Sequence, residues 1–494
     1  MTPLDQLAES FHHFGDERAF CIADTYHTYQ EVSDVIGKIQ RLISAAGADK
    51  HCNIGILTHD DLETYASVFA VLFLGHAFVP IHPQHPRDRN QAIIDQAEIK
   101  ILLSSKKDSA AQQFSSGITA LIHTGESLPG SELIRVPLAS HQPAYLLFTS
   151  GSTGVPKGVP VTVSNLNAFL SAFFTLGYKV DHRDRFIQTF DMTFDLSIMC
   201  YMAPLCIGAC VYTVPFDAIK YMHAYKLMEQ YEITFALLVP SMLTGLRRYF
   251  PEIQLPKMKY SLFCGEALFE DITLEWARCL PNAVIQNVYG PTEATVFCMV
   301  YQVYREGRNK SLNGILSIGK PVNGMTAFIA GDDQKPVPDN EKGELCLSGE
   351  QLSPGYWKNE AKNREAFFNY KGNRYYRTGD LAAFDADGDF YFAGRIDNQV
   401  KINGFRVELS EIDFFARAYL KTHEVIAHVM VNDTGHSQIY LFVEQFKGSF
   451  DHLESYLKTK LPSYMLPAKY LSVDQFPLNS NGKVDRKELM KMIP

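Results

Sequence analysis

The stretch LLFTSGSTGVPKG, residues 146–158, places hydroxyl side chains, glycines and a lysine directly after an apolar run. Glycines allow backbone N–H groups to turn toward an anion, hydroxyl groups add donors, and Lys157 adds positive charge. This combination predicts a loop that cradles a polyphosphate, although a solvated Gly/Ser connection fits the composition equally well. The candidate contacts are Ser150, Gly151, Ser152, Thr153, Gly154 and Lys157.

This loop is not a Walker A loop. Lys157 follows Pro156 and precedes Gly158, whereas the Walker A pattern requires Gly before the lysine and Ser or Thr after it. Two regular elements are expected to position the loop. Residues 144–148 predict a strand, and SNLNAFLSAFF predicts a helix with Ser164 as its N-terminal cap.

The whole chain has the composition of a globular protein of two or three domains, with 494 residues, 46% hydrophobic and 20% charged. Its net charge of −9 provides no basic field for a phosphate backbone, so nucleic acid is not expected as a partner. The apolar run at residues 66–81 contains His76 and Pro80 and is short for a membrane span, so we expect a buried helix and strand there.

The N-terminus lacks the basic segment and apolar core of a secretory signal. Nine cysteines without a C-x-x-C pair are typical of a reducing compartment rather than of a disulfide framework or a zinc site. The predicted location is therefore the cytoplasm, and most of the cysteines are expected to be small core residues.

Short apolar runs alternate with helix-length periodic stretches, which predicts α/β layers built around largely parallel sheets. The last hundred residues differ. EVIAHVMVND and QIYLFVEQF predict strands and FDHLESYLKTKL predicts a helix, as in a small separate α+β domain. Charge, Gly and Asn gather in GRIDNQVKINGF, residues 394–405, so the predicted domains are 1–396 and 397–494.

The loop at residues 146–158 closely resembles the phosphate-loop motif of the adenylate-forming enzymes, which include amino-acid adenylation domains, acyl-CoA ligases and luciferases. Further motifs of that family occur in the same order along almost the whole chain. They are LFLGHAFVPIHP from Leu72, FDLS from Phe194, NVYGPTEATV from Asn287, GELCLSG from Gly343, YRTGDL from Tyr376, GRIDNQVKINGFRVELSEID from Gly394, LPSYMLP from Leu461 and NGKVDR from Asn481.

The resemblance implies a large N-terminal adenylate-forming domain and a small, mobile α+β C-terminal domain. It also implies that the chain binds ATP and Mg²⁺ and joins a carboxylate to the α-phosphate, with pyrophosphate leaving. Thr153 and Lys157 would embrace the β- and γ-phosphates, Thr292 would contact the α-phosphate, and Glu293 would bind the metal.

The same resemblance assigns the base and the sugar of the nucleotide. Tyr289 would offer an aromatic face to adenine and Asn287 an amide to its edge. Asp380 would accept hydrogen bonds from the ribose hydroxyls, with Arg395 close by. The nucleotide-binding set is completed by Gly265, Glu266 and Gly290.

Two C-terminal residues are assigned by resemblance alone. Lys483, in NSNGKVDR, matches the lysine that bridges the substrate carboxylate and the nucleotide, and in isolation it would be read as a solvated surface residue. Asp397 matches the hinge about which the C-terminal domain turns. In the second pose, a face around Gly404 would admit a thiol that attacks the adenylate and releases AMP.

Asp195 in FDLS matches the aspartate that amino-acid adenylating members place against the substrate ammonium group, although a helix N-cap is its alternative role. The aligned side-chain pocket carries no further charge, which favours a small apolar amino acid. Its residues are Leu196, Met199, Leu238, Leu262, Cys264, Val288, Val296 and Phe297.

LFCGEAL, from Leu262, together with NVYGPTEATV and the length of the chain, most resembles the D-alanine ligases that charge a D-alanyl carrier protein. In that subfamily a cysteine corresponding to Cys264 helps to select D-alanine. The acceptor is expected to be the phosphopantetheine of a separate carrier protein, since no carrier domain follows Pro494.

Three alternatives remain open at this point. The chain is compatible with a freestanding peptide-synthetase adenylation enzyme for a small L-amino acid, and with an acyl-CoA ligase that uses free CoA. A non-catalytic binding homologue fits less well, because every expected catalytic side chain is present.

Overall fold

The computed structural model describes the chain except for residues 49–50, 108–112, 115–116, 126–129, 152–153, 217, 332–333, 398, 422–423, 433–435, 478–483, 485 and 493–494. Its internal contacts divide it into two compact units. The first unit comprises Met1–Pro83, Ile93–Phe148 and Gly158–Ile396. The second comprises Gln84–Ala92, Thr149–Lys157 and Asp397–Pro494, so it differs from the predicted C-terminal domain by two short segments.

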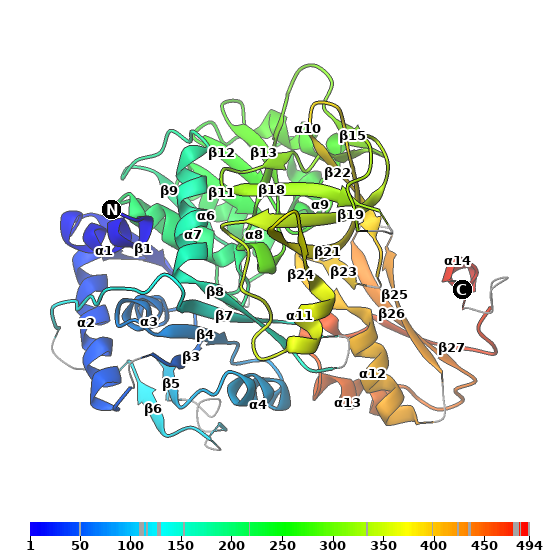
Figure 1. Cartoon of the computed structure of the whole chain (residues 1–494), viewed down its shortest axis with the longest axis horizontal. Helices are drawn as coiled ribbons and strands as arrows, with labels where there is room; N and C mark the ends of the chain where they lie inside the picture. The colour runs from blue at the N-terminus through cyan, green and yellow to red at the C-terminus, as the bar shows by residue number, and fades with distance from the viewer. Residues whose placement is uncertain are drawn as a thin grey trace. The chain divides into compact units, whose positions relative to one another are not determined.

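The first unit contains a large, mostly parallel sheet (Figure 1). Its central strands pair in parallel, and antiparallel strands are added at its two ends. In spatial order the strands are β17 (Lys320–Pro321), β14 (Met299–Val303), β13 (Val284–Tyr289), β12 (Tyr260–Phe263), β11 (Phe235–Leu238), β9 (Arg185–Gln188), β10 (Cys210–Thr213), β1 (Arg18–Ile22) and β2 (Thr25–Thr28).

A second sheet leads to the candidate phosphate loop. The pairs β3–β4, β3–β5, β4–β7 and β5–β6 are parallel. The strands are almost continuously apolar, as expected for a parallel sheet covered on both faces. Their order is β6 (Ala120–His123), β5 (Ile101–Ser104), β3 (Asn53–Leu57), β4 (Ala77–Ile81), β7 (Pro143–Thr149) and β8 (Lys157–Thr162).

A third sheet is antiparallel. It carries Asp380 on its longest strand and Arg395 on the neighbouring strand. Its strands are β18 (Met325–Ala330), β19 (Gly343–Gly349), β21 (Asn373–Phe384), β20 (Phe367–Tyr370) and β22 (Phe390–Arg395), and a short hairpin lies beside it, β15 (Ser311–Leu312) with β16 (Ile315–Leu316).

Helices follow most of the parallel strands, which is the arrangement that right-handed crossovers require. The apolar run at residues 66–81 forms a buried helix and a buried strand, as predicted. The helices are α1 (Pro3–His13), α2 (Tyr29–Ala45), α3 (Leu62–Phe73), α4 (Arg87–Gln96), α6 (Val163–Thr175), α7 (Leu196–Cys206), α8 (Lys220–Gln230), α9 (Pro240–Leu246), α10 (Glu270–Cys279) and α11 (Glu360–Ala366), with single turns η1 (Arg247–Tyr249) and η2 (Thr292–Ala294).

The helix after the loop begins earlier than predicted. Thr162, not Ser164, caps α6, because Thr162 has an extended backbone and its side chain accepts a hydrogen bond from the Asn165 N–H. The Asn165 side chain in turn accepts from the Thr162 N–H at 3.1 Å, which completes a reciprocal capping box. Ser164 lies inside the first helical turn.

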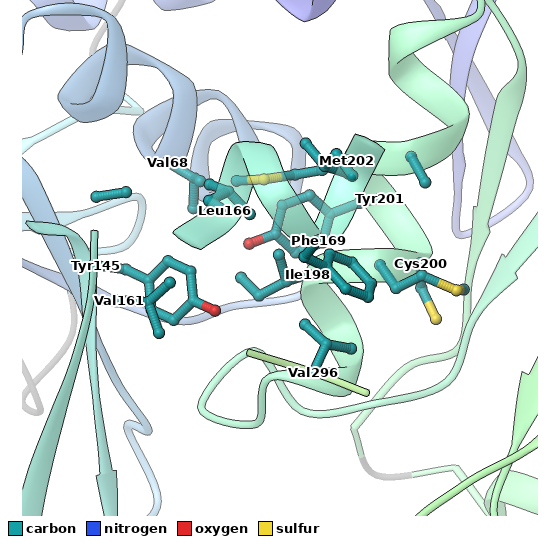
Figure 2. Close-up of a cluster of buried hydrophobic side chains, with 14 of the residues drawn as sticks. Val68, Tyr145, Val161, Leu166, Phe169, Ile198, Cys200, Tyr201, Met202 and Val296 are labelled. Atoms are coloured by element: carbon teal, nitrogen blue, oxygen red, sulfur yellow. The ribbon is translucent and has the colours of Figure 1, made fainter. Parts of the chain in front are cut away.

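Helices α6 and α7 share a buried cluster with β7 and β8 (Figure 2). The hydroxyl groups of Tyr145 and Tyr201 lie inside this cluster, and neither has a hydrogen-bond partner among the described residues. Burial raises the pKa of Tyr145 well above its ordinary value, and the charge of Asp195 raises it further. The cluster thus lies next to the residue assigned to the substrate ammonium group.

The second unit contains an α+β fold with its own core, formed by residues such as Ile412, Leu441 and Leu457. The predicted strands and helix of the last hundred residues are confirmed. Its elements are the hairpin β23 (Gln399–Ile402) and β24 (Phe405–Glu408), α12 (Leu409–Leu420), the sheet β25 (Val425–Val431), β26 (Ser437–Glu444) and β27 (Lys469–Val473), α13 (Asp451–Lys458), η3 (Ser463–Met465) and α14 (Arg486–Lys491).

Together these elements confirm the predicted α/β class with layered, largely parallel sheets. All nine cysteines are free thiols. Among the described residues, no helix combines the length and the apolar character that crossing a membrane requires.

Candidate active site

Asp380 is the centre of a buried polar cluster in the first unit. Its Oδ1 accepts a hydrogen bond from Nη1 of Arg395 at 2.7 Å, and its Oδ2 accepts one from the Tyr289 hydroxyl group. Asp380 and Arg395 are directly opposite each other on β21 and β22, so strand register brings them together. Three residues predicted for the ribose and the base are therefore adjacent in the fold.

Tyr289 lies at the end of β13 and is almost completely buried. Burial raises the pKa of its hydroxyl group well above the ordinary value, and the neighbouring Asp380 carboxylate adds to the increase. The hydroxyl group therefore remains protonated and donates to Asp380 throughout the physiological pH range.

Asn287 has a structural contact of its own. Its Nδ2 donates to the carbonyl oxygen of Ser317 at 2.9 Å and to that of Leu316 at 3.4 Å. The amide nitrogen therefore holds the segment after β16 against β13, and an adenine contact through the other amide atom remains a prediction.

The turn after β13 is tightly packed. A Cβ at Gly290 would lie 2.5 Å from the Phe297 Cα and 2.8 Å from the Val296 carbonyl oxygen, so only glycine fits there. Thr295 and Val296 both have positive φ values, 55° and 69°, which are strained conformations for β-branched residues. The Thr295 hydroxyl group donates to the Gln351 carbonyl oxygen at 2.7 Å and holds this conformation in place. Strain of this kind gathers at ligand sites.

The strained turn positions Thr292 and Glu293 on the single turn η2. The Glu293 carboxylate is buried and accepts a hydrogen bond from the Tyr356 hydroxyl group at 2.7 Å. Among the described residues no group of three or more His, Cys, Asp or Glu converges on a metal position. Magnesium in nucleotide sites typically uses one or two carboxylates together with phosphate oxygens, so a lone buried carboxylate fits the assigned role.

Gly265 and Glu266 follow β12 in a turn where Gly265 has a φ of 90°. An Oε2 atom of Glu266 accepts a hydrogen bond from the Ser241 N–H at 2.8 Å, at the first turn of α9. The turn therefore ties the ends of two neighbouring strands together.

Tyr356, the hydrogen-bond partner of Glu293, was not predicted from the sequence, because an aromatic residue in an irregular segment carries no motif signal.

Asp195 occupies the N-cap position of α7, but its side chain makes no capping hydrogen bond. This geometry argues against its alternative role as a helix cap. The side chain is buried, and buried carboxylates in proteins are typically paired with a cation or with hydrogen-bond donors. The first turn of α7 also carries the pocket residues Leu196 and Met199, both buried.

The predicted pocket residues fall into one buried cluster, with one exception. Leu238 packs in the other core cluster, on the opposite face of the sheet. Successive strand residues face opposite sides, so its neighbour Leu237 is the one that shares the cluster of Leu262. The members within that cluster are Leu196, Met199, Leu262, Cys264, Val288, Val296 and Phe297.

Cys264 has two thiol neighbours that sequence reasoning did not predict. Burial raises the pKa of Cys200 and of Cys298, and in both cases the proximity of Cys264 raises it further. Cys200 and Cys298 are therefore uncharged at neutral pH, and with Cys264 they form an apolar, polarisable wall. Their positions along the chain are too far apart for spacing to have revealed the group.

Residues Thr149–Lys157 of the phosphate loop belong to the second unit. The Ser150 hydroxyl group donates to the Arg406 carbonyl oxygen at 3.0 Å, and Lys157 Nζ lies 3.4 Å from Oε1 of Glu408. Gly154 has a φ of 75°. Ser152, Thr153 and the predicted catalytic Lys483 lie outside the described residues. Asp397 is the first residue of the long C-terminal segment of this unit, and its Oδ1 accepts from the Gln399 N–H at 3.1 Å.

Comparison with known proteins places this geometry in a family. A family model described as AMP-binding enzyme matches residues 7–357. The chain belongs to the AMP-binding enzyme family. It is a member of the adenylate-forming superfamily, as its motifs predicted.

Named relatives extend this assignment. This AMP-binding enzyme is 31% identical to tyrocidine synthase 1 of Brevibacillus parabrevis over 98% of the chain, yet it spans only 44% of that protein. It is 30% identical to zwittermicin A synthase ZmaJ of Bacillus cereus, and the match covers 96% of the chain and 92% of ZmaJ. The solved adenylation domain AlmE of Vibrio cholerae, in complex with glycyl-adenosine-5'-phosphate, superimposes with a TM-score of 0.88 at 25% identity, covering 99% of this chain and 97% of AlmE.

Proposed function

We propose that this AMP-binding enzyme adenylates a small amino acid with ATP and transfers it to the phosphopantetheine thiol of a separate carrier protein. A carboxylate oxygen of the amino acid attacks the α-phosphorus of ATP, and the bond to the bridging oxygen breaks as pyrophosphate leaves. The thiolate sulfur then attacks the carbonyl carbon, and AMP leaves. The observation that carries the proposal is Asp195, a buried carboxylate that does not cap its helix.

The apolar surroundings of Asp195 support an amino acid with a small side chain. The substrate ammonium group would pair with the Asp195 carboxylate, and the substrate side chain would meet residues of the apolar cluster such as Met199 and Cys264. The peptide-synthetase relatives favour an amino acid over a fatty or aryl acid. The glycyl-adenosine-5'-phosphate in the structure of AlmE favours a small one.

The ribose of the nucleotide would be held by groups whose contacts the structure describes. Asp380, oriented by Arg395 and Tyr289, would accept from the ribose hydroxyls. Lys157 would neutralise the β- and γ-phosphates, Thr292 would contact the α-phosphate, and Lys483 would stabilise the charge that develops during attack. A magnesium ion bound through Glu293 would neutralise phosphate charge on the leaving side.

D-Alanine is our specific candidate. If Asp195 fixes the ammonium group and Lys483 the carboxylate, exchanging enantiomers exchanges the methyl group and the hydrogen on Cα. A wall that accepts a methyl group in one direction only discriminates by roughly 10- to 200-fold. The group of thiols around Cys264 would form that wall. A small L-amino acid, adenylated by a freestanding enzyme of the peptide-synthetase type, is the second candidate.

Amino-acid-dependent exchange of pyrophosphate into ATP tests the proposal. Wild type is expected to exchange with D-alanine faster than with L-alanine, glycine or short-chain acids. Cys264→Ala is expected to raise the rate with L-alanine relative to D-alanine, because removing the sulfur opens space on one wall. Cys279→Ala is the matched control, since this buried thiol lies in the other core cluster and should leave the enantiomer ratio unchanged.

Each alternative predicts a distinct result in this assay. Preference for a small L-amino acid would assign the enzyme to the peptide-synthetase type. Exchange only with acids that lack an amino group, followed by AMP release with free CoA, would contradict the role of Asp195. A reduced rate with an unchanged enantiomer ratio in Cys264→Ala would show that Cys264 serves packing alone.

A further inference from the structure

Two glutamates of the C-terminal segment contact the phosphate loop within the second unit. Oε2 of Glu411, in the first turn of α12, accepts a hydrogen bond from the Gly151 N–H at 3.2 Å. Oε1 of Glu408, at the end of β24, lies 3.4 Å from Lys157 Nζ. One backbone donor and one cation of the candidate phosphate cradle are thus both directed at carboxylate oxygens.

The same helix face also approaches Gly154 of the loop. Phe414 and Phe415 lie one turn beyond Glu411 on α12, and a Cβ added to Gly154 would come within 2.8 Å of the Phe414 ring and 3.1 Å of the Phe415 ring. Residues three and four apart share a helix face, so a single face of α12 supplies both the carboxylate and the aromatic contacts.

These carboxylates are held in place by other groups. Glu411 is completely buried, and its Oε1 accepts from Arg89 Nη1 at 2.8 Å, while Arg89 itself is 5% exposed. Burial raises the pKa of Glu411, and Arg89 and the Gly151 N–H counter that increase. Glu408 accepts from Gln399 Nε2 at 2.8 Å, and its side chain is only 11% exposed. The positions of both carboxylates are therefore fixed by partners outside the loop.

A carboxylate and a phosphate use the same donors, because each presents anionic oxygens to backbone N–H groups and to lysine. We propose that Glu408 and Glu411 compete with the polyphosphate of ATP for the phosphate loop, so that polyphosphate binding and the docking of α12 on the loop exclude each other. The inference rests on the proposed role of the loop as the phosphate cradle. Departure of pyrophosphate would free Lys157 and Gly151 for the two glutamates, which links product release to the arrangement seen here.

Pyrophosphate binding by the full chain, measured by calorimetry without any amino acid, tests the competition. Glu408→Gln keeps an oxygen that accepts from Gln399 but removes the charge that competes for Lys157. We expect it to bind pyrophosphate about three- to tenfold more tightly than wild type, as loss of one partly buried ion-pair competitor implies. Glu408 is preferred to Glu411 as the test position, because neutralising Glu411 would leave Arg89 buried without its carboxylate.

Two controls separate this mechanism from a general loss of negative charge. Glu454→Gln removes a carboxylate of the same unit that pairs with Lys458, and it should leave pyrophosphate affinity unchanged. In a Lys157→Met background, Glu408→Gln should produce no gain, because the two residues act on each other. Pyrophosphate should also increase amide hydrogen exchange along α12 in wild type.

An unchanged pyrophosphate affinity in Glu408→Gln, or the same gain in the Lys157→Met background, would overturn the proposal. Absence of pyrophosphate binding in both wild type and Glu408→Gln would overturn it as well. If pyrophosphate binds and Glu408→Gln tightens it, while no amino acid supports exchange, the competition stands and the proposed function fails.

Discussion

At the residue scale, polar side chains hold the segment that leads to Asp195. Lys220 Nζ donates to the Thr189 carbonyl oxygen at 3.0 Å. His82 Nε2 lies 2.8 Å from Oδ2 of Asp191, and Oδ1 of Asp191 accepts from the Thr193 N–H at 2.8 Å. These contacts hold the backbone just before α7, the helix at whose N-cap Asp195 lies.

Asp60 adds a titrating group to these charges. It accepts a hydrogen bond from the Phe216 N–H at 2.5 Å, but burial raises its pKa from 3.8 to about 6. The Phe216 N–H and Lys220 lower this pKa, while Asp191 and Asp61 raise it. Between pH 4 and pH 6 the folded chain therefore retains a proton that the unfolded chain has lost, so this group makes stability fall as pH rises.

Replacing Asp60 with Asn should remove this decrease in folding stability with rising pH. Asn retains an oxygen that accepts from Phe216, but it does not ionise. The melting temperature of Asp60→Asn relative to wild type should therefore rise between pH 4 and pH 7, as measured by thermal unfolding in matched buffers. A melting-temperature difference that stays constant or falls over this range would show that the fold does not raise the pKa of Asp60.

At the element scale, the turn of the phosphate loop requires glycine at position 151. A Cβ at Gly151 would lie 2.0 Å from the Val155 carbonyl oxygen, a backbone atom that cannot move without reshaping the loop. The Gly154 N–H donates to the Gly151 carbonyl oxygen at 3.0 Å, which closes the turn. The flanking strands β7 and β8 are apolar and buried along most of their length, so the loop is mounted on a rigid support.

Gly151→Ala should therefore weaken ATP binding while leaving the rest of the fold intact. Displacing one backbone donor from a charged ligand corresponds to a loss of roughly 10- to 100-fold in affinity. Gly15→Ala is the matched control, because a Cβ there meets only ordinary contacts, the nearest at 3.7 Å. Isothermal calorimetry with ATP, together with melting temperatures, measures both effects. Equal ATP affinity in the two variants would remove the loop from the ATP site.

At the scale of the whole molecule, the chain changes units between Ile396 and Asp397. The Ile396 N–H donates to the Gly379 carbonyl oxygen at 2.9 Å and belongs to the first unit, whereas Asp397 accepts from Gln399 in the second. The hydrogen-bond partners thus change from the first unit to the second unit across a single peptide bond. This position coincides with the proposed hinge.

Asp397→Pro tests the hinge through the two half-reactions. Proline restricts φ at the residue that is proposed to absorb the rotation, so thioester formation should fall more than adenylate formation. Pyrophosphate exchange reports the first step, and loading of a phosphopantetheinylated carrier protein reports the second. An equal loss in both steps, or no loss in either, would argue against a hinge at Asp397.

The sequence alone determined the α/β class, the strand and helix around the phosphate loop, the small C-terminal fold and the family. These features depend on local sequence or on the order of motifs along the chain, and both can be observed in the sequence itself. The residue that caps α6 could not be predicted from the sequence. Thr162 and Ser164 are both good caps by type, and only the backbone conformation selects Thr162.

Tertiary structure decided the contacts between distant residues. Tyr289 and Asp380 are 91 positions apart, and Gly151 and Glu411 are 260 apart, so no periodicity connects them. Strand alternation made Leu237, and not Leu238, the residue that shares the cluster of Leu262, a difference of one position that reverses the face of the sheet. The sequence specifies which side chains are present. The pairing of a buried carboxylate with a phosphate-loop donor depends on how the elements that carry these two groups pack together.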